Sequence, residues 1–472
     1  MPGLALLATL GKCLSLPPLI PSIPGVTESL TEDAPPLPIL QVLTPLLESP
    51  PFTPSNTKPK EIGYFWTGSG DKFHKDMYIH FLATYSIDDV QDTFGSLLWV
   101  TDVPSSGNDP HHLGPSLDGK TLVGGGLLSL LKAHDPHNLQ DMAFYFDTTN
   151  SYRLAFKKSN RAILPSIADE IRTKPDGRFY ITYMDSAVGT SPGRLVGTDA
   201  DFNIIHEWPE DVEGTLNILS SDSERNFIPT SDFVEQISIL KPSTEIRRGN
   251  TLRLWDLKSK KILNTIAISD GGGIHDVKFF PGNPRWCCLY DDYANGKPGR
   301  AELLYELGPK ARDTTATYTD ITQDGRFIYL ALTTANHIAA LDISDLNNVK
   351  RLDDPDEGHT TVGPHYVKVT PDQKYLLVTD HFVQAGEIGL INTTADFKAL
   401  YFDLNEDRNL SFNRSTDLRK EFPERGGAKP HSSNVFDLMD TGKSSGLGIV
   451  WTYGLKMCCH ETSQQSRREV LM

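Results

Sequence analysis

The feature of this sequence that most constrains its fold is a turn-and-strand unit that recurs along the chain. A short strand is followed by a Pro/Asp/Gly turn and then by a run of β-branched and aromatic residues. Five copies read SLDGKTLVGGG (116–126), KPDGRFYITYMD (174–185), FPGNPRWCCLYDD (280–292), TQDGRFIYLALTT (322–334) and TPDQKYLLVTDH (370–381). Asp-Gly and Pro-Asp suit the backbone angles of tight turns, so each copy predicts a β-hairpin.

A further strand usually follows each hairpin, as in residues 249–266 and 337–352. Units of about four antiparallel strands, spaced ~40–60 residues apart with almost no amphipathic helix between them, are typical of β-propeller blades of the WD40 kind. The turns provide seven landmarks, at Leu117, Pro175, Ser223, Pro281, Gln323, Pro371 and Asp437. We therefore predict an all-β, seven-bladed β-propeller. The rival fold is a pair of β-sandwich domains, which predicts no fixed repeat.

The two ends of the chain differ from this repeating body. Residues 1–58 are rich in Pro, Ser and Thr and show no strand or helix periodicity, which predicts a disordered leader. The propeller is expected over residues 59–443, and residues 444–472 form a polar tail that we expect to be poorly ordered. The first ~20 residues have the apolar length of a signal segment but no basic start or clear cleavage site. The cytoplasm is therefore favoured, with secretion left open.

Composition and motifs exclude several functions. A net charge of −16 argues against a nucleic-acid partner, because such binding depends on Lys and Arg. No apolar run is long enough to predict a transmembrane helix. Four of the five cysteines form adjacent pairs, which fits neither a disulfide framework nor a CxxC metal clip. The chain has no G-x-S-x-G elbow or Walker loop, and the glycine runs at 124–126 and 271–273 lack the strand–helix context of a nucleotide site.

The positions that open the innermost strands carry an unusual set of side chains. Six residues before each landmark stand His111, Asp169, Asn217, His275, Thr317, His365 and His431. Rotation about the propeller axis relates equivalent positions in different blades. These side chains are therefore expected to form one ring at one mouth of the central channel. The rival sandwich fold predicts no such alignment.

A ring rich in histidine predicts a metal centre, because neutral imidazole is the commonest protein ligand of transition metals. A single buried histidine is more often hydrogen-bonded to a carbonyl, but four in one register favour a shared ion. Imidazole suits copper, iron, zinc and nickel alike, so the ring by itself leaves the identity of the metal open. The predicted ligands are His111, His275, His365 and His431, with His112 and Asp169 as further candidate ligands and as the catalytic candidates. Further candidates are His381 at the same mouth, and Asp320 and Asp232 as carboxylates that orient an imidazole.

Several segments of the chain resemble one known family. They lie between residues 61 and 437 and include FLATYSIDD, the doublet His111–His112, RLVGTDADFNIIHEWPED (194–211), NFIPTSDF (226–233) and VGPHYVKVTPDQKYLLVT (362–379), with the strongest similarity over residues 249–344. In their order and spacing these segments resemble the selenium-binding proteins, whose characterised members include methanethiol oxidases. The resemblance implies a propeller fold. For the oxidase members it also implies copper-dependent conversion of methanethiol, O2 and water to formaldehyde, hydrogen sulfide and hydrogen peroxide.

The resemblance carries over to the site only in part. The doublet His111–His112 matches the family's His-His motif, and His431 approximately matches a histidine near the family's C-terminus. The cysteine segment that follows the doublet in the family is LGPSLDGKT here, so we expect that route of selenium binding to be lost. Asp169 stands where the family has the first histidine of a His-x-x-His-Cys pattern. A carboxylate there shifts the metal preference towards iron, manganese or zinc.

These observations leave one leading hypothesis and two rivals. The leading hypothesis is a divergent, metal-dependent oxidase that acts on a small thiol or related small molecule with O2. Its expected metal is copper, as the resemblance implies, with iron, manganese or zinc as alternatives. One rival is a non-catalytic propeller that serves as an interaction platform for a protein partner. The other is a lactonase or cyclase on the same fold, in which the metal polarises a carbonyl group.

Overall fold

The fold is described from a computed structural model of the chain. The chain divides into two units, residues 1–49 and 50–472, and every described residue belongs to the second. The described residues are 59–70, 79–88, 93–106, 110–116, 118–126, 141–174, 177–187, 193–208, 216–219, 227–232, 249, 251–267, 276, 305–307, 316–357, 361–380 and 396–438. The predicted leader, up to residue 58, and the predicted tail lie outside them. In these ranges no helix has the length and apolar character needed to cross a membrane.

The described strands form six four-stranded antiparallel sheets. The sheet that joins the two ends of the propeller contains β24 (Ala428–Asp437), β1 (Glu61–Ser69), β2 (Ile79–Ser86) and β3 (Leu97–Ser106). The next three contain β4 (Pro110–Pro115), β5 (Thr121–Gly126), β6 (Ala143–Asp147) and β7 (Ala155–Asn160); β8 (Pro165–Thr173), β9 (Phe179–Ser186), β10 (Arg194–Thr198) and β11 (Ile204–Trp208); and β12 (Leu216–Leu219), β13 (Phe227–Asp232), β14 (Thr251–Asp256) and β15 (Lys261–Ala267). The last two contain β16 (Ala316–Ile321), β17 (Phe327–Leu332), β18 (His337–Asp342) and β19 (Lys350–Arg351); and β20 (Tyr366–Val369), β21 (Tyr375–Thr379), β22 (Lys398–Leu404) and β23 (Leu410–Asp417).

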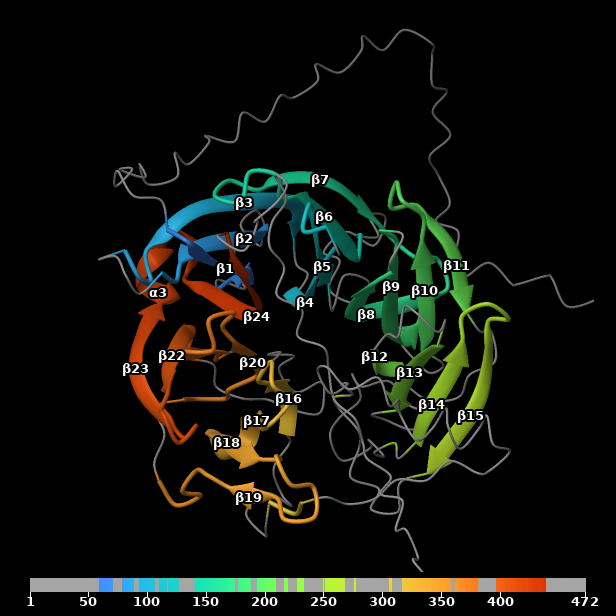
Figure 1. The fold of residues 1–472 in the computed structure, drawn as a ribbon. Helices are drawn as coiled ribbons and strands as arrows, with labels where there is room; N and C mark the ends of the chain where they lie inside the picture. The colour runs from blue at the N-terminus through green and yellow to red at the C-terminus, as the bar shows by residue number, and fades with distance from the viewer. Residues whose placement is uncertain are drawn as a thin grey trace, which may run out of the picture. The chain divides into compact units, whose positions relative to one another are not determined.

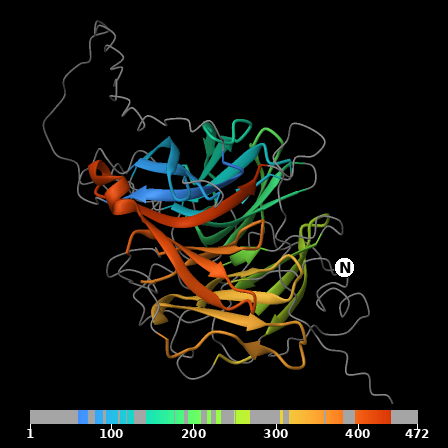
Figure 2. The same ribbon diagram turned by 60° about the vertical axis from the view of Figure 1, so that its left-hand side comes forward.

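The sheets are the blades of a β-propeller (Figure 1). Each blade has one edge strand innermost, namely β4, β8, β12, β16, β20 or β24. These inner strands contact one another from blade to blade: β24 lies beside β4, β4 beside β8, β8 beside β12, and β20 beside both β16 and β24. The pairing of β24 with β1 builds one blade from both ends of the repeat region, which Figure 2 shows from another side. The predicted all-β propeller with four-stranded blades is confirmed.

The predicted number of blades needs correction, because the described residues form six blades and not seven. Six of the seven landmarks lie between the two innermost strands of a described blade or at the end of β24. The seventh, Pro281, lies between β15 and β16, outside the described residues, as does His275. The prediction counted one blade per turn signal. A turn does not by itself establish the strand pairing that makes a four-stranded sheet.

The hairpin turns explain why the repeat is visible in the sequence. A Ser or Thr two residues before an Asp donates its hydroxyl to the Asp carboxylate, which also accepts from a backbone N–H two residues further on. The pairs are Ser116–Asp118, Thr322–Asp324 and Thr370–Asp372. Gly119 and Gly325 follow with φ of +65° and +70°, a conformation that favours glycine. The prediction of hairpins at these places is confirmed.

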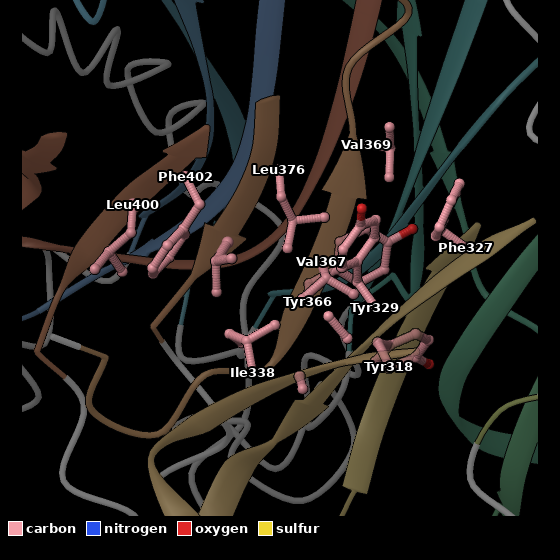
Figure 3. Packing of buried hydrophobic residues seen from close by; sticks show 13 residues of the cluster. Tyr318, Phe327, Tyr329, Ile338, Tyr366, Val367, Val369, Leu376, Leu400 and Phe402 are labelled. Carbon is pink, nitrogen blue, oxygen red and sulfur yellow. The ribbon is translucent and has the colours of Figure 1, made fainter. Parts of the chain in front are cut away.

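Apolar side chains from neighbouring blades fill the space between them. Between the β16–β19 and β20–β23 blades the buried cluster includes Tyr329, Ile338, Val367, Leu376 and Phe402 (Figure 3). Burying one such side chain contributes about 1.5–3 kcal/mol. These contacts lock the blades against one another and so hold their inner strands in a fixed relation.

The glycine run at 124–126 has a packing role. It lies in β5, where the Trp66 indole covers it and donates its N–H to the Gly125 carbonyl at 2.6 Å. A Cβ atom at Gly124 would lie 2.9 Å from the Trp66 ring. The absence of a side chain there therefore allows β1 of one blade to approach β5 of the next.

Candidate metal centre

Irregular strand pairing marks the residues that open the inner strands. In β4, Pro110 pairs with Gly126 and Leu113 with Gly124, so two residues, His111 and His112, face a single residue of β5. Such a β-bulge bends the strand and redirects its side chains. In a regular strand His111 and His112 would point to opposite faces of the sheet. The bulge instead lets both rings enter one cluster.

The same irregularity occurs in other inner strands at equivalent places. The bulged residues are Asp169 and Glu170 in β8, Thr317 and Tyr318 in β16, Ile218 in β12 and His431 in β24. In β24, for example, Pro430 and Ser432 pair with the consecutive residues Thr67 and Trp66, which leaves His431 between them. In β8, β16 and β24 the repeated bulge is thus the local structure that presents side chains to the site.

Three histidines form a candidate ligand group. One ring nitrogen from each of His111, His112 and His431 lies within 4.8 Å of the others. The ring centroids are 3.9 Å apart for His111 and His112, 4.7 Å for His111 and His431, and 5.4 Å for His112 and His431. All three residues are buried, with at most 3% of each residue's surface exposed. Residues more than 300 positions apart in the chain therefore meet in one enclosed place.

His365 extends this group. It stands directly before β20, is fully buried, and has its ring centroid 4.2 Å from that of His431 and 5.9 Å from that of His112. It is not one of the three histidines whose ring nitrogens lie within 4.8 Å of one another. His365 therefore lies beside the three clustered imidazoles, next to His431.

Hydrogen bonds to the backbone fix the positions of the histidines. Hydroxyl groups of neighbouring inner and second strands donate to three of their carbonyls: Thr317 Oγ1 to His365 at 2.8 Å, Thr379 Oγ1 to His431 at 2.8 Å and Ser432 Oγ to His111 at 2.7 Å. All three hydroxyl-bearing residues are buried. Each bond joins one blade to the next. This hydroxyl–carbonyl belt therefore couples the placement of the rings to the packing of the blades.

His111 has a defined tautomer. Its Nδ1 lies 2.7 Å from the Ala168 carbonyl oxygen in the adjacent blade, and a carbonyl can only accept. Nδ1 therefore carries the proton and donates it, which leaves the lone pair on Nε2. A histidine that ligates a metal through one nitrogen commonly donates from the other in this way.

Two consecutive carboxylates from β8 lie beside the doublet. Asp169 Oδ1 is 3.4 Å from His111 Nδ1 and 3.2 Å from His112 Nδ1, and Glu170 Oε2 is 3.4 Å from His112 Nδ1. Glu170 also forms an ion pair with Arg172. Burial lowers the pKa of Arg172, but Glu170 together with Tyr366, Asp276 and Tyr318 outweighs this effect and leaves that pKa above its ordinary value. A charged guanidinium thus compensates one of the two buried carboxylates.

The geometry of the three imidazoles fits a transition-metal ion. Nitrogens bound to one ion at about 2.0–2.1 Å lie at most ~4.2 Å apart. The three donor atoms lie within 4.8 Å of one another, so shifts of about half an ångström would close them around an ion. The rings come from two inner strands of adjacent blades. Further blades contact them through Ala168 at His111 Nδ1, Tyr318 at His112 Nδ1 and Thr379 at the His431 carbonyl. Such support favours precise coordination.

The structure brings together some of the predicted residues and separates others. His111 and His431 meet as predicted, His365 lies next to them, and His112, predicted to be catalytic, belongs to the donor group. Asp169 lies against ring nitrogens, in the place of an orienting carboxylate. Asp320 accepts from the Val369 N–H and so links β16 to β20. His275, His381 and the side chains of Asp232 and Asn217 lie outside the described residues.

Sequence reasoning missed Glu170 and Tyr318. Tyr318 is buried, and its hydroxyl lies 3.0 Å from His112 Nδ1. Burial, together with the nearby Asp169 carboxylate, raises its pKa well above the ordinary value, so the hydroxyl is neutral. Both residues stand one position after a ring residue, as His112 does. Applying the six-residue rule one position later would have found them.

The described fold and the clustered histidines together define a β-propeller with a candidate metal centre in its inner strands. A hypothetical selenium-binding protein from Sulfolobus tokodaii has a similar structure, with a TM-score of 0.61 and 16% identity over 84% of this chain and 96% of that one. At this identity the similarity is evidence for a shared propeller fold and for nothing further. A periplasmic gluconolactonase from Pseudomonas aeruginosa has a TM-score of 0.38 and 12% identity over 76% of this chain and 83% of its own, which supports no inference. No family model matches the chain, and no curated protein matches it.

Proposed function

We propose that this protein is a metal-dependent oxidase of a small thiol or related small molecule, with copper as the metal. The observation that carries the proposal is the convergence of His111, His112 and His431 in one buried cluster. Three imidazoles are a donor set that suits copper, iron and zinc. A bound ion would supply a site for O2 and for the sulfur of a thiol.

The chain's own residues would hold and orient that ion. His111 would ligate through Nε2, because its Nδ1 donates to Ala168. Asp169 and Glu170 would orient the doublet from the side of its Nδ1 atoms. The near-complete burial of the histidines limits the reaction to a small substrate and excludes bulk water.

Metal content of tag-free protein tests the proposal. Inductively coupled plasma mass spectrometry should find about one equivalent of copper or another transition metal per chain, and a His111→Ala/His431→Ala variant should lose it. The matched control is His206→Ala, since His206 lies on the outer strand β11 and is stacked on Trp208 at 5.3 Å. If the wild-type protein contains no metal, or the double variant keeps it, the oxidase proposal is refuted. The interaction-platform hypothesis then replaces it.

Activity then distinguishes the two enzymatic hypotheses. Copper-loaded protein given methanethiol in aerated buffer should release hydrogen peroxide, and the His111→Ala/His431→Ala variant should not. Hydrolysis of a lactone without peroxide release from thiols would favour the lactonase alternative.

A further inference from the structure

Tyr318 contacts the histidine cluster from another blade of the propeller. It lies in the bulge of β16, where Thr317 and Tyr318 together face one residue of β17. Its ring stands edge-on to His112 with centroids 4.4 Å apart, and edge-on to His365 at 5.2 Å. Only 1% of its surface is exposed. The ring is therefore wedged between two of the clustered imidazoles.

The Tyr318 hydroxyl lies closer to Nδ1 of His112 than either β8 carboxylate does. The distance is 3.0 Å, compared with 3.2 Å for Asp169 Oδ1 and 3.4 Å for Glu170 Oε2. A carboxylate oxygen only accepts, so these neighbours favour the tautomer in which Nδ1 carries the proton. A phenol oxygen can accept from the same N–H. In that tautomer the lone pair of His112 is on Nε2.

We propose that Tyr318 is a positioning residue of the metal centre, whose hydroxyl accepts from Nδ1 of His112 and so directs Nε2 of that ring towards the ion. The inference rests on the proposed function of the same site. It adds that an uncharged group from β16, and not only the β8 carboxylates, sets the orientation of one ligand. Removing a partner of this kind typically lowers metal affinity by about 10- to 100-fold.

The test compares Tyr318→Phe, which deletes only the hydroxyl, with Tyr366→Phe. Tyr366 is the matched control because it is also buried, next to Tyr318, with its ring centroid 5.8 Å from that of His112. Copper affinity is measured by competition with a chelator. Tyr318→Phe should bind copper about 10- to 100-fold more weakly, with an altered Cu(II) electron paramagnetic resonance spectrum, and Tyr366→Phe should stay within about twofold of wild type.

A metal-free measurement tests the hydrogen bond itself. In protein labelled with 15N-histidine, long-range 1H–15N correlation spectra report which nitrogen of each neutral imidazole carries the proton, and a His112→Gln variant assigns the signals. Wild type should show His112 protonated on Nδ1, and Tyr318→Phe should shift these signals.

Three results would overturn the inference. A wild-type His112 protonated on Nε2 contradicts it directly, whether or not Tyr318→Phe folds. Unchanged affinity and an unchanged spectrum in Tyr318→Phe refute the role of Tyr318 while the metal centre stands. A wild-type protein that binds no copper instead refutes the proposed function, and the inference with it.

Discussion

The hydroxyl–carbonyl belt makes a sharp prediction for Thr379→Val. Thr379 Oγ1 donates to the His431 carbonyl at 2.8 Å, and the side chain is fully buried. Valine keeps the shape and removes the hydrogen bond, so the free energy of unfolding should fall by about 1–2 kcal/mol. Because this bond holds the bulged residue of β24, copper affinity should also fall, by about tenfold.

Thr84→Val is the matched control for this prediction. Thr84 is equally buried in β2, but its hydroxyl has no hydrogen-bond partner among the described residues. Replacing it should leave stability unchanged or raise it by up to ~1 kcal/mol, because an unsatisfied buried hydroxyl is removed. Urea denaturation of the metal-free variants followed by circular dichroism gives the two free energies. Equal losses in both variants, or unchanged copper affinity in Thr379→Val, would refute the role assigned to the belt.

Two further predictions concern the scaffold. Gly124→Ala should lower the free energy of unfolding by about 1–3 kcal/mol, because the new methyl group would overlap the Trp66 ring. In a Trp66→Phe background, urea denaturation should show a clearly smaller loss for the same substitution. An equal loss in both backgrounds would contradict the packing of Trp66 against Gly124. Burial, with Asp372 and Asp437 nearby, raises the pKa of Glu61 from 4.5 to about 8. The contribution of Glu61 to stability should therefore be fully present below pH 4.5 and be lost as the pH rises through 8. Glu61→Gln should remove this dependence and be more stable than wild type by about 2 kcal/mol at pH 8.5, whereas an identical pH profile of unfolding would be evidence against it.

The fold was predictable because its signals are local. Turns such as Thr322–Asp324 and Thr370–Asp372 use the same side-chain bonds in each blade, so their spacing along the chain shows the repeat directly. The closing of the propeller by β24 and β1 joins residues at opposite ends of the repeat region, and no turn signal marks it. The number of blades was the least secure part because it relied on turns without strand pairing.

The sequence predicted the site residues only through the rule that counts six positions back from each turn. His111 and His431 came from counting positions, and the structure places them together. Periodicity alone would have put His112 on the opposite face of β4 from His111. A bulge depends on how two strands pair, which the strand's own residues do not reveal. The sequence therefore singled out His112 only as part of the doublet, and the contact of Tyr318 with it emerged from the structure.

The most direct test of the metal centre is the position of the ion. Anomalous diffraction at the copper edge, from crystals of copper-loaded protein, should show one strong peak about 2.0–2.2 Å from nitrogens of His111, His112 and His431. A copper peak elsewhere, or three histidines that keep their places while copper binds at the protein surface, would contradict the account.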